Sequence, residues 1–306
     1  MAPHTVFVCA ATGCQGGAVA RQLRAFGWEV QTTTRNTDSP AAQALASIGV
    51  KVYAGDWNDA AALEVAFAGC DLLFLNLMPD MTNFPAEFEQ GQNILRIANA
   101  VGVTHVVYSS GIDIPPGKSN PFRDTAFKAK KDLERYLSTA GFQYWTNLRP
   151  GFFMANLLSP KVNFMYPEAA ETGRYTVIFG PDTPLPMIDH EDIAAFAVAA
   201  FQQPDRFHGQ HITLVSEMVP FGRALETISR ATGKNIHAKY LKDDEIDAAM
   251  AKNRLLVLQT TLKEVPVSEA TDGKSWGIAM GTFERFVERE KTEFLETYRN
   301  VEALKE

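Results

Sequence analysis

Small residues spaced three apart near the N-terminus could hold the phosphates of a dinucleotide. They follow the apolar run Val6–Val8 and precede a helical pattern, Gly16–Phe26. In a strand, tight turn and helix of this kind, free backbone N–H groups and the helix dipole attract an anion, and glycine lets the backbone approach it. We therefore expect a pyrophosphate-binding turn. The residues expected to contact the cofactor here are Ala10, Thr12, Gly13, Gln15 and Gly16.

The ends of the next two predicted strands carry side chains suited to the rest of a dinucleotide. An NAD-binding protein usually places an acid after the second strand, whereas Arg35 follows Thr34 here. A guanidinium suits a 2′-phosphate, so we expect NADP(H) rather than NAD(H); the alternative is an exposed loop arginine. Asp56 could accept from the adenine amine with Trp57 packed nearby, or it could cap the following helix.

The elements that must position these residues alternate along the first 150 residues. Short apolar runs alternate with helical patterns, which is typical of a parallel sheet with crossover helices. The predicted strands are 5–10, 29–34, 51–54, 72–76, 105–110 and 143–148, and the predicted helices are 16–26, 41–48, 60–67, 87–101 and 125–140. The fold class expected is α/β, a Rossmann-type doubly wound parallel sheet with a smaller α/β C-terminal part.

The pattern changes after Pro150, where prolines and glycines interrupt the chain. We expect a Rossmann domain over 1–150 and, over 151–306, a lid-like part that completes a substrate cleft and does not fold independently. The strands predicted in this part are 175–179, 211–215 and 236–240, and the helices are 191–201, 221–232 and 281–298.

Several motifs together resemble the NmrA-like family, a group of atypical short-chain dehydrogenases/reductases that includes fungal nitrogen regulators and NADPH-sensing proteins of animals. The resemblance covers nearly the whole chain. It implies a Rossmann-type domain with NADP bound across the switch point of the sheet. The motifs are Ala11-Thr12-Gly13-Cys14-Gln15-Gly16-Gly17, Thr34-Arg35-Asn36, Gly55-Asp56, Val107-Tyr108-Ser109-Ser110-Gly111, Leu148-Arg149-Pro150-Gly151-Phe152-Phe153 and Gly209-Gln210-His211-Ile212.

Two departures from the family pattern bear on chemistry. Ala10 replaces the usual first glycine, which costs little if its φ is negative. Short-chain reductases typically carry Tyr-x-x-x-Lys on the helix after the fifth strand, and here Ala126 and Lys130 occupy those positions. In isoflavone-reductase-like relatives a lysine alone acts on the substrate, so the resemblance implies Lys130 as the catalytic residue and as a cofactor contact. The alternative is a lysine on a solvated helix face, since Lys128 and Lys131 flank it.

The remaining site residues are predicted from their places at strand ends. Asn76, Leu77, Pro150 and Phe153 are expected to contact the cofactor, and Ser110, Phe152, Met154 and Asn156 to face the substrate. The alternatives are a loop serine and ordinary core residues. His190 follows Asp189 in a pattern that favours a helix N-terminus over a catalytic histidine.

Composition narrows the function classes. The chain has 306 residues, is 46% hydrophobic and carries a formal charge of −7. This charge argues against direct binding of nucleic acid or an anionic membrane. No apolar run reaches transmembrane length, no signal peptide is evident, and the three cysteines have no metal-ligand spacing. We expect a cytoplasmic protein, or a nuclear one if it regulates transcription.

Two functions remain open on the sequence. One is an NADPH-dependent reductase of a small carbonyl, enone or quinone-like substrate. The other is an NADP(H)-binding redox sensor that acts through a protein partner, because sensing needs only different affinities in two states. A non-redox isomerase or dehydratase and any oligomeric state are compatible with the same residues.

Overall fold

The computed structural model describes residues 4–80, 82–113, 121–262 and 272–304. The chain forms two compact units, each continuous in space but not in sequence. Unit 1 comprises Met1–Ile112, Asp124–Pro150 and His190–Ile212, and unit 2 comprises Asp113–Arg123, Gly151–Asp189 and Thr213–Glu306. The chain therefore passes into unit 2 after Pro150 and returns to unit 1 at His190.

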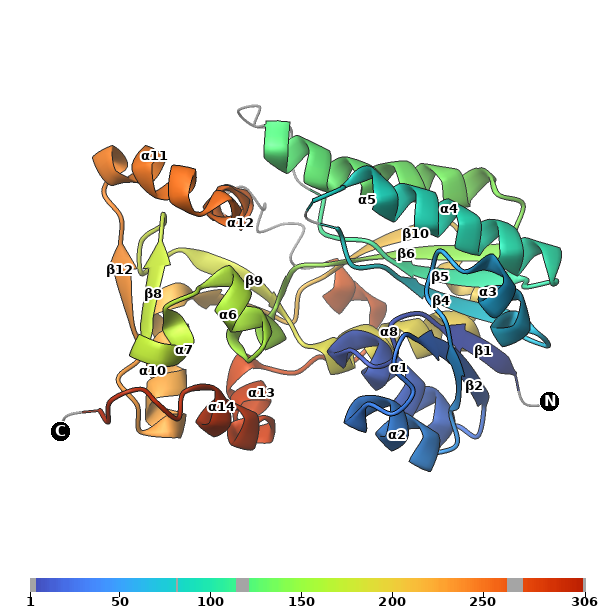
Figure 1. Cartoon of the computed structure of the whole chain (residues 1–306), viewed down its shortest axis with the longest axis horizontal. Helices are drawn as coiled ribbons and strands as arrows, with labels where there is room; N and C mark the ends of the chain where they lie inside the picture. Colours follow the sequence, from blue (N-terminus) through green and yellow to red (C-terminus); the bar gives the residue numbers. More distant parts are fainter. Residues whose placement is uncertain (1–3, 81, 114–120, 263–271, 305–306) are drawn as a thin grey trace. The chain divides into compact units, whose positions relative to one another are not determined.

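A seven-stranded sheet forms the centre of unit 1 (Figure 1), in the order β10-β6-β5-β4-β1-β2-β3. The strands from β3 to β6 run parallel to their neighbours. This order reverses between β1 and β4, which is the Rossmann arrangement, so the predicted fold class is confirmed. The strands are β1 (Thr5–Val8), β2 (Glu29–Thr34), β3 (Lys51–Ala54), β4 (Leu72–Asn76), β5 (His105–Ser109), β6 (Tyr144–Pro150) and β10 (Gln210–Leu214).

Helices cover both faces of this sheet. They are α1 (Cys14–Ala25), α2 (Pro40–Ser47), α3 (Ala60–Phe67), α4 (Pro85–Ala100), α5 (Pro121–Thr139), α8 (His190–Gln202) and α9 (Pro204–Phe207). Figure 1 shows α4 and α5 on one side and α1, α2 and α8 on the other. Side chains cap two of them: Ser39 Oγ accepts from Ala42 N at 3.3 Å, and Asp59 accepts from Ala62 N at 3.0 Å.

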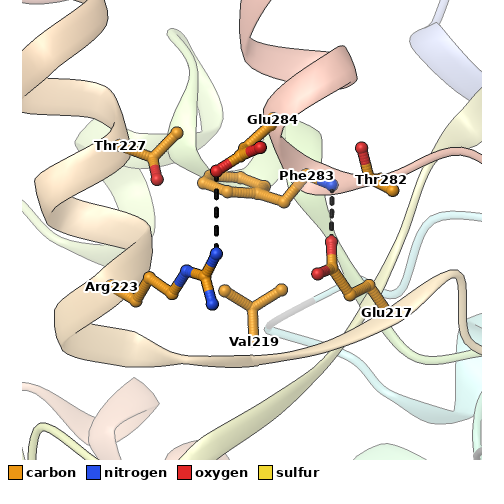
Figure 2. A pocket seen from close by; sticks show the side chains of 7 residues that line it. All are labelled: Glu217, Val219, Arg223, Thr227, Thr282, Phe283 and Glu284. Atoms are coloured by element: carbon orange, nitrogen blue, oxygen red, sulfur yellow. Dashed lines mark hydrogen bonds and ion pairs between the residues drawn. The ribbon is translucent and has the colours of Figure 1, made fainter.

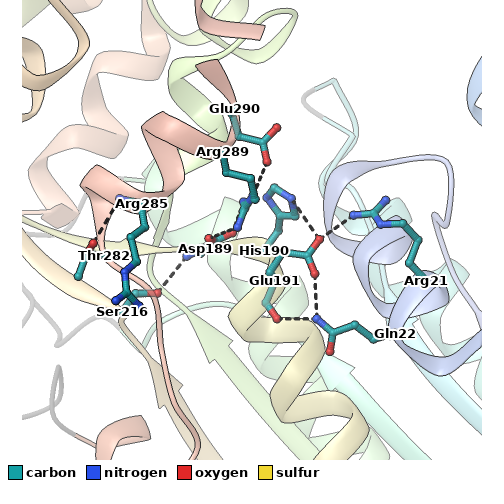
Figure 3. Close-up of polar contacts among 10 residues, drawn as sticks. All are labelled: Arg21, Gln22, Asp189, His190, Glu191, Ser216, Thr282, Arg285, Arg289 and Glu290. Carbon is teal, nitrogen blue, oxygen red and sulfur yellow. Dashed lines mark hydrogen bonds and ion pairs between the residues drawn. The ribbon is translucent and has the colours of Figure 1, made fainter. Parts of the chain in front are cut away.

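Buried apolar side chains and polar contacts hold the layers of unit 1 together. Phe7 of β1 stacks on Phe67 of α3 with 3.9 Å between ring centroids, and both belong to the core beneath α3, α4 and α5. On the other face, Glu191 of α8 accepts from Arg21 and Gln22 of α1 at 2.7 and 2.8 Å (Figure 3). His190, at the start of α8, is buried.

Unit 2 contains two small sheets with helices. In one sheet β9 pairs parallel with β7 and antiparallel with β11, and in the other β8 pairs parallel with β12. The strands are β7 (Phe152–Phe153), β8 (Arg174–Val177), β9 (Pro184–Ile188), β11 (Glu217–Pro220) and β12 (His237–Tyr240). The α-helices are α6 (Lys161–Met165), α7 (Ala169–Thr172), α10 (Phe221–Thr232), α11 (Asp243–Lys252), α12 (Gln259–Leu262), α13 (Phe283–Arg289) and α14 (Lys291–Thr297).

The single helix predicted over 281–298 was wrong. The chain leaves helical geometry at Glu290 (φ −94°, ψ 23°), so α13 and α14 are separate. Arg289, the last residue of α13, donates to both oxygens of the buried Asp189 carboxylate at 2.7 and 2.9 Å (Figure 3). Within the described ranges, no helix is both long and apolar enough to cross a membrane.

Candidate functional site

The predicted phosphate turn lies between β1 and α1. Thr12 and Gly13 are exposed, and Gly13 precedes the first residue of α1 in extended geometry. A Cβ added at Gly13 would meet only the Ala10 carbonyl oxygen, at 3.3 Å, whereas one at Gly16 would lie 2.5 Å from that oxygen. The two glycines therefore have different tasks: Gly13 keeps the surface of the turn open, and Gly16 lets α1 pack against the end of β1.

This turn fits the pyrophosphate of a dinucleotide. The first turn of α1 contains no acidic residue and Gly13 provides no side-chain cap, so neither an acid nor a capping side chain from these positions competes with an anion at the positive end of the helix dipole. Gln15 is buried, and among the described residues nothing accepts a hydrogen bond from its Nε2.

The condition under which Ala10 would cost little, a negative φ, is not met. Its φ is +52°, in the left-handed region, and it is the one non-glycine residue with positive φ among those described. Gly13 N donates to Ala10 O at 2.9 Å, so Ala10 is the first residue of the turn that leads into α1. A residue with a Cβ is strained there, which explains why glycine usually occupies this position. Strand β1 ends at Val8, two residues earlier than predicted.

The other predicted cofactor residues of unit 1 lie at the same edge of the sheet, where parallel strands end. Arg35 follows β2 and is exposed. Asp56 follows β3, and its Oδ1 accepts from Asn58 N at 2.7 Å, while Asp59 supplies the helix cap. Trp57 is half-buried and packs on the core beneath α3.

Asn76 and Pro150 end strands β4 and β6, one on each side of β5. Asn76 is half-buried, while Pro150 is buried and its carbonyl accepts from Ile112 N at 3.0 Å. Leu77 is buried within the core under α4. Any contact that Leu77 makes with a cofactor is therefore a contact of its backbone.

Lys130 also reaches this edge of the sheet from α5. A Cβ added at Gly111, just beyond β5, would lie 3.5 Å from its Cδ. Its side chain is 16% exposed, so the alternative of a solvated lysine does not hold. Lys128 and Lys131, in contrast, are exposed, and Lys128 pairs with Asp132.

Sequence reasoning missed the partner of this lysine. Lys130 Nζ donates to Glu87 Oε1 of α4, and the Glu87 side chain is 1% exposed. The signal was present in the spacing of α4, because Glu87 shares one helical face with Gly91, Ile94, Leu95 and Ala98, all of them buried. A carboxylate within a buried stripe needs a partner, and that requirement points to a specific contact.

Ser110, predicted to face the substrate, takes part in a buried network. Its hydroxyl donates to Glu134 Oε1 at 2.5 Å, and Arg149 donates to both oxygens of Glu134 at 3.0 and 2.6 Å. His211 Nδ1 lies 3.5 Å from Glu134 Oε2. Glu134 is one helical turn beyond Lys130, so this network fixes α5 against β5, β6 and β10.

The predicted residues that follow Pro150 belong to unit 2. Phe153 and Asn156 are half-buried, and the Lys161 ammonium lies 5.2 Å from the centre of the Phe153 ring. Phe152 is 6% exposed. Met154 is fully buried, so it lines no open space in this structure.

A pocket in unit 2 contains none of the predicted residues. Two polar contacts join residues of its lining: Phe283 N donates to Glu217 at 2.8 Å, and the Arg223 guanidinium lies 3.8 Å from the Glu284 carboxylate (Figure 2). The lining residues are Glu217, Val219, Arg223, Thr227, Thr282, Phe283 and Glu284. Among the described residues, no three His, Cys, Asp or Glu side chains are placed to hold a metal ion.

Known proteins resemble this chain in sequence and in fold. FrzB of Cladobotryum sp, an NmrA-like family domain-containing oxidoreductase, is 31% identical in an alignment of length 250 that covers 75% of this chain and 74% of FrzB. NmrA, a negative transcriptional regulator solved with NADP, has a TM-score of 0.74 at 20% identity and 98% coverage of each chain. QOR2 of Escherichia coli, an NADPH-dependent quinone oxidoreductase solved with NADPH, has a TM-score of 0.66 at 22% identity, covering 93% of this chain and 99% of QOR2.

The structural likenesses show the fold, while the sequence comparison identifies the family. The model of the NmrA-like family matches residues 3–304, nearly the whole chain. The resemblance predicted from the motifs is therefore confirmed: the chain belongs to the NmrA-like family.

Proposed function

We propose that this protein is an NADPH-dependent oxidoreductase that reduces a small carbonyl, enone or quinone-like substrate. The observation that carries the proposal is the position of Lys130. The Lys130 side chain, largely buried and paired with Glu87, passes beside Gly111 just after β5, at the edge of the sheet that carries the phosphate turn. Ligands of open parallel sheets bind at this edge, near the switch point between β1 and β4.

NADP(H) is the proposed cofactor. The turn at Gly13 and the N-terminus of α1 would hold the pyrophosphate, and Arg35 would pair with the 2′-phosphate. Asp56 and Trp57 would contact the adenine, and Asn76 and the backbone at Leu77 the nicotinamide ribose. FrzB is named an oxidoreductase, and QOR2 was solved with NADPH; both agree with this assignment.

Lys130 supplies the protein's part of the chemistry. When bound, the nicotinamide supplies a hydride to the substrate. Lys130 would donate a hydrogen bond and then a proton to the substrate oxygen, which becomes negative as the hydride arrives. Ala126 stands where related reductases carry a tyrosine, so the lysine would act without a phenol.

A redox sensor is the second candidate. Ala126 removes the usual proton donor, and NmrA, of the same fold, is a transcriptional regulator. A sensor needs NADP(H) binding and a protein partner but no turnover.

NADPH oxidation across a panel of quinones, enones and aldehydes separates the two functions. We expect turnover with at least one class and a loss of about 100-fold or more in Lys130→Ala, the usual size of a general-acid contribution. Lys128→Ala, which removes an exposed lysine from the same helix, should keep the wild-type rate. Tight NADPH binding without turnover on any panel member would contradict the reductase and favour the sensor.

A further inference from the structure

The partner of Lys130 is more deeply buried than Lys130 itself. Glu87 is 1% exposed, against 16% for the lysine side chain. Its Oε1 accepts from Lys130 Nζ, and no donor among the described residues reaches its Oε2. A buried carboxylate is costly unless a charge compensates it, so Glu87 depends on this one cation.

Close packing of α4 and α5 brings the two charges together. Gly91, one turn beyond Glu87 on α4, faces Leu133 of α5, and an added Cβ there would lie 2.3 Å from Leu133 Cδ2. A glycine at this crossing therefore lets the helices approach. Leu133 and the Glu134–Arg149 contact then hold α5 in register around Lys130.

Tyr108, an ionisable neighbour of Glu87, does not compensate its charge. Tyr108 of β5 is fully buried, and burial together with the nearby carboxylates of Glu87 and Glu134 raises the pKa of its phenol well above the ordinary value of 10. Tyr108 therefore remains neutral. The other carboxylate near Tyr108, Glu134, accepts hydrogen bonds from Arg149 and from the Ser110 hydroxyl.

We propose that Glu87 is the positioning residue for Lys130, fixing the ammonium beside the end of β5. The inference rests on the proposed function in one respect, that Lys130 acts on the substrate. Because the pair carries no net charge, Lys130 presents a hydrogen-bond donor rather than an unbalanced positive charge. Such a donor suits an uncharged carbonyl or quinone oxygen better than it suits a carboxylate substrate.

Acetylation of lysines by acetic anhydride tests the contact between Glu87 and Lys130 directly. After Asp-N digestion, tandem mass spectrometry measures the acetylation of each lysine in the Asp124–Lys131 peptide. This peptide also contains Lys128 and Lys131, which are exposed internal references. In the wild-type protein Lys130 should react about tenfold more slowly than they do. Glu87→Gln should abolish that difference, because the amide cannot compensate the ammonium charge.

Two further variants control for folding and for net charge. Glu89→Gln makes the same chemical change at an exposed position of α4 and should leave Lys130 slow. Glu87→Asp keeps the charge one methylene farther away and should retain part of the protection. If Glu87→Gln, with a wild-type melting profile, leaves Lys130 as slow as in the wild-type protein, the positioning role is refuted. If Glu87→Gln does not fold, a partial or full loss of Lys130 protection in folded Glu87→Asp supports the role, and Lys130 acetylation as slow as in the wild-type protein refutes it.

The same labelling with saturating NADPH keeps the two proposals apart. Protection of Lys130 by NADPH, with Lys128 and Lys131 unchanged, is the result expected if Lys130 lies at the cofactor. Absence of protection would count against the proposed function while leaving the contact between Glu87 and Lys130 intact.

Discussion

We propose that Arg35 sets the preference of the protein for NADP(H) over NAD(H). The residue is exposed at the end of β2, and no acidic residue stands there to accept from a ribose 2′-hydroxyl. A charge-assisted pair between guanidinium and phosphate is about 1.5–3 kcal/mol stronger than no contact. The preference for NADP(H) therefore depends on this side chain.

Replacing Arg35 by alanine should weaken NADPH binding by about 10- to 100-fold and NADH binding by less than about threefold. Fluorescence titration with both cofactors measures this. Arg96→Ala, at an exposed site on α4, is the matched control and should change neither affinity. Equal losses for both cofactors in Arg35→Ala would remove the argument for a 2′-phosphate site.

Ala10 is the one position where the local sequence opposes the backbone that the fold requires. With φ at +52°, its Cβ is strained, and glycine adopts this region without that cost. Ala10→Gly should therefore raise the free energy of unfolding by up to about 1 kcal/mol. Urea denaturation checks this; a destabilised Ala10→Gly would mean that the turn has a different conformation.

Single residues also mark the limit of what the sequence could predict. Lys130 could be found because the family motif gives its place on the helix. Glu87 could not be paired with it, since the two are 43 residues apart and meet only when α4 packs on α5. Met154 looked like a substrate contact from its position after β6, but it is fully buried.

At the scale of elements, the turn between β1 and α1 makes two separate demands on glycine. Gly16→Ala places a Cβ 2.5 Å from the Ala10 carbonyl oxygen and should cost about 1–3 kcal/mol of stability through overpacking. Gly13→Ala places its Cβ 3.3 Å from the same oxygen, a tight contact that a shift of a few tenths of an ångström relieves, and should change the unfolding free energy only slightly.

Thermal unfolding and NADPH titration of the two variants together test this division. A side chain at Gly13 would intrude on a bound pyrophosphate, so Gly13→Ala should lose affinity without losing stability. A stable Gly16→Ala protein, or wild-type NADPH affinity in Gly13→Ala, would show that the turn was misassigned.

The strands and helices of the first half were predictable because each is a local pattern. β2, β3, β4 and α3 have the predicted bounds, since apolar runs end at glycine or polar residues there. The second half was harder. β7 has two residues, and β9 contains two prolines, so their pairing depends on tertiary neighbours and not on propensity.

At the scale of the whole molecule, a buried histidine links folding to pH. His105 of β5 is 2% exposed. Burial, with smaller contributions from the positive charges of His208 and His4, lowers its pKa from 6.5 to about 3. Between these values the unfolded chain binds a proton that the folded protein does not, so stability is lost as pH falls below 6.5.

This histidine alone should lower the free energy of unfolding by about 2 kcal/mol between pH 7 and pH 5. Urea denaturation at both values measures the change. His105→Phe keeps an aromatic ring beside Tyr144 and Phe201 and should remove that part of the pH dependence. His237→Gln, at an exposed histidine, should keep it. A His105→Phe protein with the wild-type slope would contradict the assignment.

Single-turnover oxidation of bound NADPH tests the central claim most directly. The wild-type protein is mixed with NADPH and then with a quinone, and absorbance at 340 nm is followed beside Lys130→Ala. The wild-type protein should lose absorbance rapidly. Lys130→Ala should lose it at least about 100-fold more slowly and should keep its NADPH affinity. Equal rates in the two proteins would contradict the role of Lys130. Firmly bound NADPH that no quinone, enone or aldehyde oxidises would contradict the oxidoreductase itself.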